Sequence, residues 1–439
     1  MRQRISVEHI EEPLSAEVRQ SYLDGIELEI NQLSQLDPIW LAFCQEKLGL
    51  ANESLNFILN QWLRLHQRGF PSHELDYLRL IERQNRALKD VYVAMFRLAP
   101  GLIYQLKNSE PQIFVWLMLQ PEFGQSQQHR VVGLENLSQL TPIQANILVV
   151  QSSLDALDRD LVSLIEGEAP YAEPCFQWLK LRQTLSTSLC KRWLKFERID
   201  ERALNTTLAQ LNDRDAIEWL DEHASGEQML YERLLVKQDR NTWFRQYFGI
   251  EPAALPSAMV ATYAKLLELK EFEWFDIQSE HAAYHYALVG DTQWTKSVIE
   301  HLATVDESDG ETWLQALYVV YGERLPLNHL QLGIDYQWEE AVANLQTWLE
   351  TGDEQLSLPS RLGFAFGFES SLRAMSDSAI SADFRDWIWR QICLGARVYV
   401  PWDMSMPTRQ QQQILDKLKQ NKPAMDRFNL RNDHAVMGY

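Results

Sequence analysis

Two histidines, His281 and His285, have the spacing in this sequence that best suits chemistry. They are four residues apart, so on a helix they would share one face, as two zinc ligands do. A zinc-protease motif also needs a glutamate directly after the first histidine as general base, but that position is Ala282. Since His285 falls on the apolar face of its predicted helix, we interpret it as a packed or capping histidine rather than a metal ligand.

Other sequence patterns that are typical of catalytic or nucleotide-binding sites give no support for an active site. The sequence contains no phosphate-binding G-x-x-x-x-G-K-[ST] loop and no G-x-S-x-G nucleophile elbow. The Gly363–Gly367 segment has the wrong spacing for a dinucleotide fingerprint, and we assign it to close helix packing. Asp158 and Asp160 are two apart and would point in different directions on a helix, so we expect solvated charge there. The sequence therefore predicts a protein that is not an enzyme and has no cofactor or metal.

The four cysteines, Cys44, Cys175, Cys190 and Cys393, include no C-x-x-C pair, which favours free thiols in a reducing compartment. The first residues lead into an acidic stretch with no apolar signal core, so we expect a cytoplasmic protein. The longest apolar run, Ile113–Leu119, is far shorter than the roughly 20 residues that span a bilayer, so no membrane insertion is predicted.

Composition favours helices as the elements that position these residues. With 46% hydrophobic residues the chain should fold, and 18 glycines and 16 prolines are few for a β-rich protein of 439 residues. The apolar residues of Ser54–Leu65 and of 76–98 recur every three or four positions, as on one helix face. Thr141 and Pro142 can cap and open another helix.

From residue 257 onward, the sequence predicts short helices that recur at regular intervals. Four polar residues are candidate N-caps: Ser257, Ser279, Asp291 and Asp309. Gly290 and Gly322 are candidate helix ends. Alternate caps are about 30 to 34 residues apart, which suggests stacked helical hairpins, a degenerate HEAT-like α-solenoid. We therefore predict an all-α fold with a helical N-terminal domain (1–205), a HEAT-like helical-repeat domain (206–420) and a polar tail (421–439).

The formal net charge of −20 argues against nucleic acid and anionic membranes as partners. Residues 301–360 carry eleven acidic residues against one basic residue, Arg324. This region is either a solvated surface or a docking face for a basic partner.

Tryptophan is unusually frequent, with fifteen residues, and it anchors both cores and interfaces. Trp387 and Trp389 point to different sides of one predicted helix, so we expect that they are not both core residues. The alternative to a partner surface is that these tryptophans pack in the core in the ordinary way. The candidate partner surface consists of Trp338, Glu339, Glu340, Trp348, Trp389 and Trp402.

Part of the C-terminal half resembles a HEAT-like family encoded with bacterial type VI secretion systems. The resemblance lies between residue 281 and about residue 415, roughly a third of the chain. It is carried by Ala287–Trp294, Trp313–Gly322 with Leu325, Trp348, Arg361–Gly363, Leu372, the Val398–Asp403 loop and Arg409–Gln410. It implies an accessory or scaffold role near the baseplate or sheath, with no catalytic residues.

The resulting hypothesis is a non-enzymatic scaffold that binds a protein partner, a secretion-system component if the resemblance holds. One alternative is an immunity or chaperone protein that binds a basic toxin. Another is an enzyme with a non-motif site, such as a metal-dependent hydrolase that uses His281 and His285.

Overall fold

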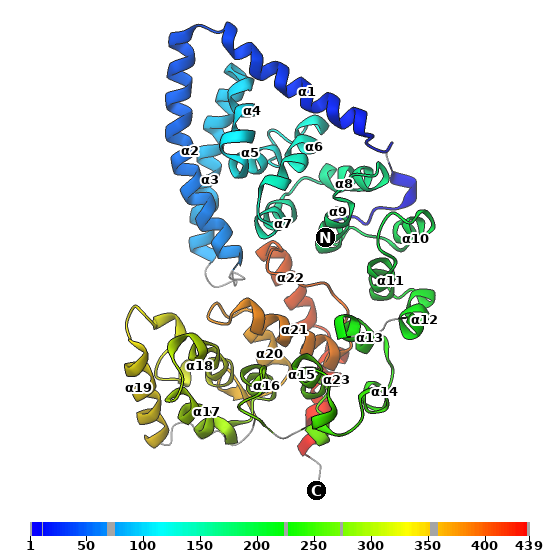
Figure 1. Cartoon of the computed structure of the whole chain (residues 1–439), viewed down its shortest axis with the longest axis vertical. Coiled ribbons are helices and arrows are strands. Elements are labelled where there is room, and N and C mark those ends of the chain that lie inside the picture. Colours follow the sequence, from blue (N-terminus) through cyan, green and yellow to red (C-terminus); the bar gives the residue numbers. More distant parts are fainter. Residues whose placement is uncertain are drawn as a thin grey trace. The chain divides into compact units, whose positions relative to one another are not determined.

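The protein is almost entirely helical. The computed structural model describes the chain except for residues 1, 11, 68–74, 224–226, 273–274, 352–358 and 437–439. Its described residues form twenty-three α-helices and one short β-hairpin (Figure 1). The all-α class predicted from the sequence is therefore confirmed.

The helices form two compact units. The first consists of residues 1–213 and 401–411, and the second of residues 214–400 and 412–439. The sequence analysis ended the first domain at 205 and left 401–411 in the second. In the structure, residues 401–411 belong to the first unit. There Gln151 Nε2 donates to Ser405 O (2.8 Å), and Gln410 Nε2 donates to Leu181 O (2.9 Å).

The described residues of the first unit form eleven complete helices. Four of them, α2, α4, α5 and α7, begin with a proline, which leaves no unpaired N–H at that position. Thr141 caps α7 and Pro142 opens it, as the sequence predicted, and Gln144 completes a capping box with Thr141 that was not predicted. The helices are α1 (Ala16–Gln32), α2 (Pro38–Gln67), α3 (Leu75–Leu98), α4 (Pro100–Ser109), α5 (Pro111–Met118), α6 (Gln127–Glu135), α7 (Pro142–Gln151), α8 (Ala156–Glu166), α9 (Ala172–Leu181), α10 (Thr187–Phe196) and α11 (Glu201–Gln210).

The second unit is built largely from short helices. Helix α22 begins in the 401–411 segment and continues into this unit. The elements of the second unit are α12 (Arg214–His223), α13 (Leu230–Val236), α14 (Arg240–Phe248), α15 (Ala258–Leu266), α16 (Ala282–Val289), α17 (Thr295–Leu302), α18 (Glu307–Tyr321), α19 (Trp338–Thr351), β1 (Ser360–Arg361), β2 (Phe364–Ala365), α20 (Phe368–Met375), α21 (Ala382–Ala396), α22 (Thr408–Lys419) and α23 (Lys422–Val436).

Two of the four predicted N-caps are confirmed. Ser257 Oγ accepts from Val260 N at the start of α15, and Asp291 Oδ1 accepts from Gln293 N. Gly290 and Gly322 end α16 and α18 with positive φ angles of 70° and 57°.

The other two cap predictions are wrong. Helix α16 is preceded by His281 rather than by Ser279. Helix α18 is capped by Asp306, whose Oδ1 accepts from Asp309 N (3.1 Å), so Asp309 lies inside the first turn.

Helix α21 is the centre of the second unit. It packs against α13, α15, α16, α20 and α23, and its residues from Phe384 to Ala396 are almost all buried. A stack of hairpins would contact mainly its sequence neighbours, so the repeat architecture remains a prediction.

The C-terminal segment differs from the predicted frayed tail. Helix α23 begins at Lys422 and packs against α20 and α21, with Ala424 and Phe428 fully or almost fully buried. Polar composition suggested a tail, but two apolar residues four apart are enough to dock a helix.

Gly363 lies in the turn of a short β-hairpin formed by Ser360–Ala365. This turn packs against the end of α18, where Gly363 N donates to Val320 O (2.8 Å), so the predicted close helix packing is present, but the two strands were not predicted. Strands β1 and β2 pair antiparallel, joined by Leu362 and Gly363, which have φ angles of 54° and 73°. A Cβ on Gly363 would lie 2.7 Å from Tyr321 O, so the turn requires glycine on both conformational and steric grounds.

We predict that Gly363→Ala lowers the free energy of unfolding by about 2 kcal/mol or more, since positive φ and a backbone clash act together. Gly333→Ala is the matched control, because Gly333 has φ 70° with open space around it. That control should lose only about 1 kcal/mol. Equal losses in urea denaturation would contradict the steric argument.

Candidate functional site

The outer face of α2 carries four large apolar side chains in contact with solvent. Ile39 is 83% exposed, Phe57 66%, Leu50 56% and Phe43 54%. They are separated by four, seven and seven residues, so they form one stripe along the helix, as in a coiled-coil seam. We call these four residues the α2 stripe.

The α2 stripe is distinct from the face that α2 uses in the fold. Its opposite face is buried through Cys44, Leu48, Ala51, Leu55 and Leu59, and the helix packs against α3, α5 and α7 (Figure 1). A helix that is apolar on opposite faces is normally covered on both. An exposed apolar stripe of this length is therefore a candidate surface for contact with another molecule.

Charged residues border the stripe unequally. At 100° per residue, exposed Glu46 and Glu53 lie on one side of the stripe, one heptad apart, and Lys47 lies on the other. Lys47 Nζ is 3.1 Å from Glu46 Oε1 and 5.4 Å from the centre of the Phe43 ring. Between Ile39 and Phe57 the border of the stripe is thus net acidic by one charge, while exposed Arg64 lies one heptad beyond Phe57.

The sequence analysis missed this stripe. It identified Leu55, Leu59 and Trp62 as one helix face, and these residues are the buried side. The heptad spacing of Phe43, Leu50 and Phe57 was the signal that could have revealed the second face.

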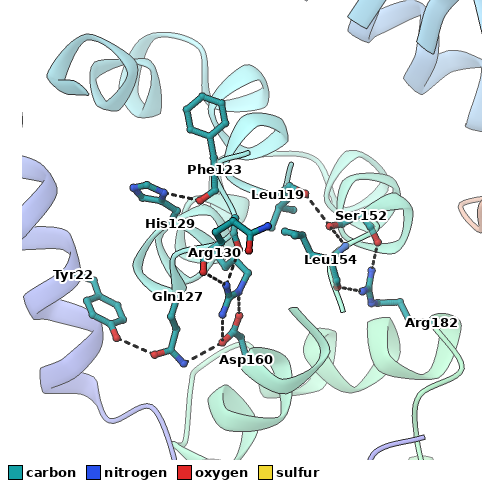
Figure 2. A network of polar contacts seen from close by, with 12 residues as sticks. Tyr22, Leu119, Phe123, Gln127, His129, Arg130, Ser152, Leu154, Asp160 and Arg182 are labelled. Atoms are coloured by element: carbon teal, nitrogen blue, oxygen red, sulfur yellow. Dashed lines mark hydrogen bonds and ion pairs between the residues drawn. The ribbon is translucent and has the colours of Figure 1, made fainter. Parts of the chain in front are cut away.

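A buried polar network holds the helices behind this surface together. Arg130 on α6 forms an ion pair with Asp160 on α8, which also accepts from Gln127 Nε2 (3.1 Å) (Figure 2). Gln127 Oε1 in turn accepts from Tyr22 OH on α1 (3.0 Å). Arg182, after α9, forms a second ion pair with Asp158.

The expectation of solvated charge at Asp158 and Asp160 is therefore wrong. Asp158 is 4% exposed and Asp160 is 1% exposed. Their side chains do point in different directions, as predicted, but α8 has neighbours on both sides. Each carboxylate meets a buried guanidinium, which offsets the desolvation of both groups.

A polar cleft of about 390 Å³ borders this network, lined in part by Trp62, Asn85, Lys89 and Ser152. Lys89 forms an ion pair with Glu122 (2.5 Å). Ser152 Oγ donates to Leu119 O (2.9 Å; Figure 2), so this hydroxyl has a structural role and is not poised as a nucleophile.

Two of the tryptophans assigned to a partner surface are core residues, so that assignment is wrong for them. Trp348 is 7% exposed and packs edge-on against Tyr321, with ring centres 5.0 Å apart. Trp389 is 4% exposed, and its Nε1 donates to Val400 O (3.2 Å). Trp387 is buried as well, because α21 is surrounded by other helices.

The remaining members of that set lie in two different units. Trp338 is half-buried: its Nε1 donates to Val305 O (3.0 Å) and its ring covers Gly310. Glu339 and Glu340 are exposed in the first turn of α19, so they could contact a partner. Trp402 is half-buried in the first unit.

The two histidines with zinc-like spacing share a hydroxyl. His281 Nδ1 and His285 Nε2 lie 2.9 Å and 3.0 Å from Thr262 Oγ1, between α15 and α16. Burial lowers the pKa of His285 to about 3, and burial also lowers the pKa of His281. In the described parts of the chain, no group of three or more His, Cys, Asp or Glu could hold a metal ion.

The four cysteines are buried and free. Burial raises the pKa of Cys190 and of Cys393 to about 12, so their thiols stay protonated at neutral pH. These sulfurs are core atoms rather than nucleophiles.

The fold and these surfaces define an all-α protein of two helical units with an exposed apolar stripe. Among the described residues, no helix has both the length and the apolar character needed to cross a membrane. Comparison with protein-family models, with curated proteins and with solved structures gives no match in any of the three. The resemblance to the type VI secretion family therefore stays a prediction.

We predict that Asp160→Asn lowers the free energy of unfolding by about 3 kcal/mol, because it leaves the buried guanidinium of Arg130 without its counter-charge. Asp24→Asn, at an exposed position on α1, is the control and should change it by less than about 0.5 kcal/mol. Urea denaturation measures both, and a near-neutral Asp160→Asn would show that the ion pair is not needed.

Stability should also fall in acid because His285 stays neutral in the fold. Its folded pKa is about 3, so below the ordinary value near 6.5 only the unfolded chain takes up the proton. The stabilising contribution is complete above pH 6.5 and declines by about 1.4 kcal/mol per pH unit as the pH falls toward 3. In urea denaturation between pH 7.5 and 5, His285→Gln should flatten this slope, and His9→Gln, at an exposed position, should not.

Proposed function

We propose that this chain is a non-enzymatic scaffold that binds an amphipathic helix of a partner protein along the α2 stripe. The observation that supports it is the stripe itself: four exposed apolar side chains in heptad register on a helix whose opposite face is already packed. Helices that insert apolar residues at this spacing are a recurrent mode of recognition.

The charges around the stripe favour a basic partner helix. Glu46 and Glu53 would face lysines or arginines one heptad apart on the partner, while Lys47 could meet an acidic residue. An antiparallel pair of α2 helices centred on Leu50 would instead set Glu46 beside Glu53 of a second copy. The net charge of −20 adds long-range attraction for a basic partner.

The finer assignment, to type VI secretion, is supported by the C-terminal resemblance alone. In that setting the partner would be a baseplate or sheath component, and the buried free cysteines fit a cytoplasmic protein. An immunity or chaperone protein for a basic toxin would use the same charge complementarity. The enzyme alternative gains no support from His281 and His285, which both contact Thr262.

A designed 21-residue helix with apolar residues in heptad register provides the first test. We expect the version flanked by lysines to bind the full chain in fluorescence anisotropy. The version flanked by glutamates should bind at least tenfold more weakly, and the difference should shrink as salt is raised.

The matching variants of the chain are Leu50→Glu and Phe57→Glu, each expected to weaken binding at least tenfold, since a charge would enter the apolar contact. Ile143→Glu is the control, because Ile143 is 54% exposed on α7 and is not part of the α2 stripe. If both helices bind equally, or if Leu50→Glu binds as well as the unmodified chain, the proposed occupant is wrong.

Identification of the natural partner tests the finer assignment separately. A photo-crosslinking residue at position 57 should capture a basic helical segment of a secretion-system component. Crosslinks to a second copy of the chain would show that the α2 stripe forms a dimer interface instead of binding a different protein. Crosslinks to a basic helix of a protein outside the secretion system would support the proposed binding mode and contradict the type VI assignment.

A further inference from the structure

Three arginines line one cleft in the second unit. The cleft has a volume of about 460 Å³ and lies where α21 ends and α14 begins. Arg240 is the first residue of α14, Arg397 follows α21 directly, and Arg427 comes from α23. Three separate segments thus deliver positive charge to one place.

Backbone carbonyls hold these side chains in position. Arg427 Nε donates to Ala396 O (2.8 Å), and Arg397 Nη2 donates to Gln238 O (2.8 Å). Arg240 donates to Leu394 O and, through Nε, to Leu234 O (2.6 Å). The guanidiniums are therefore fixed against two neighbouring stretches of backbone, 234–241 and 394–397.

The cleft carries an excess of positive charge. Of the described residues that line it, Asp239 alone has a carboxylate, and one of its oxygens already accepts from Thr242 N (3.1 Å) as the cap of α14. Gathering like charges is unfavourable unless an anion offsets them. In a chain whose net charge is −20, such a gathering also departs from the average surface.

Arg397 and Arg427 are exposed and keep donors that these contacts do not use. A guanidinium has five N–H donors in a planar fork that matches the oxygens of carboxylates and phosphates. Among the described residues, these hydrogen bonds use one donor of each side chain, which leaves the other donors of both guanidiniums for a ligand.

Arg397 also occupies a position that would suit glycine better. It ends α21 in the left-handed region, at φ 54° and ψ 50°, where glycine is the usual residue. Glu197 ends α10 in the same conformation, so this backbone geometry by itself does not single out Arg397.

We infer that this cleft binds an oxyanion, a phosphate or carboxylate group of a ligand, between Arg397 and Arg427. Arg240 supplies buried positive charge behind them, and Leu267 and Leu430 provide apolar contact for the part of the ligand that carries the anion. The site is independent of the α2 stripe, so either proposal can fail alone.

Thermal unfolding of the full chain tests the site with simple anions. Sodium phosphate or sodium acetate at about 50 mM should raise the midpoint by a few degrees above sodium chloride of equal ionic strength. A response to phosphate alone assigns a phosphoryl ligand, and a response to acetate alone assigns a carboxylate. If neither anion differs from chloride, the inference is overturned.

The variants separate anion binding from helix capping. Arg397→Gly should fold readily, because glycine adopts positive φ without strain, and should lose the response to the anion. Arg427→Ala should raise the dissociation constant for the anion at least tenfold, measured by ³¹P line broadening or calorimetry. Arg214→Ala, at an exposed position on α12, is the control and should respond like the unmodified chain. An unchanged anion response in both Arg397→Gly and Arg427→Ala would show that these arginines only cap the helix end.

Discussion

Buried guanidiniums that bind the carbonyls at helix ends are the interaction on which this structure depends. A chain divided into many short helices has many ends, and each end leaves carbonyl groups without an intrahelical partner. Where an end lies in the core, water cannot satisfy these groups. In the first unit, Arg182 provides the missing donors. It is 1% exposed and donates to Val149 O, Ser152 O and Leu154 O.

Arg361 performs the same task in the second unit. It is fully buried in the β-hairpin and donates to Ala287 O and Leu288 O at the end of α16, and to Ser371 Oγ. The hairpin that presents it requires glycine at position 363. The hairpin around Gly363 thus positions the guanidinium of Arg361 at the end of α16. At Arg397 and Arg427 the same kind of contact occurs at the edge of a cleft, where donors remain for a ligand.

Features that depend on local sequence could be predicted in part, since two of four N-caps were placed correctly, and features that depend on distant neighbours could not. Ser257, Asp291 and the two helix-ending glycines were recognisable because a cap acts on residues within one turn. The burial of Asp160 could not be inferred, because its partner Arg130 lies thirty positions away on another helix. Trp348 and Trp389 show the same limit, since only the packing around α18 and α21 decides that they are core residues.

The energetics of the α2 stripe explain why charge should decide its partner. Burying a large apolar side chain contributes about 2 kcal/mol, so the four residues supply about 8 kcal/mol. Association itself costs about 4–15 kcal/mol in lost freedom of motion. Apolar contact alone therefore leaves little net affinity, and the acidic border at Glu46 and Glu53 has to select among apolar helices. Under the proposed function, a surface balanced in this way would bind only when both the apolar register and the opposite charge are present, and it would thereby avoid indiscriminate association.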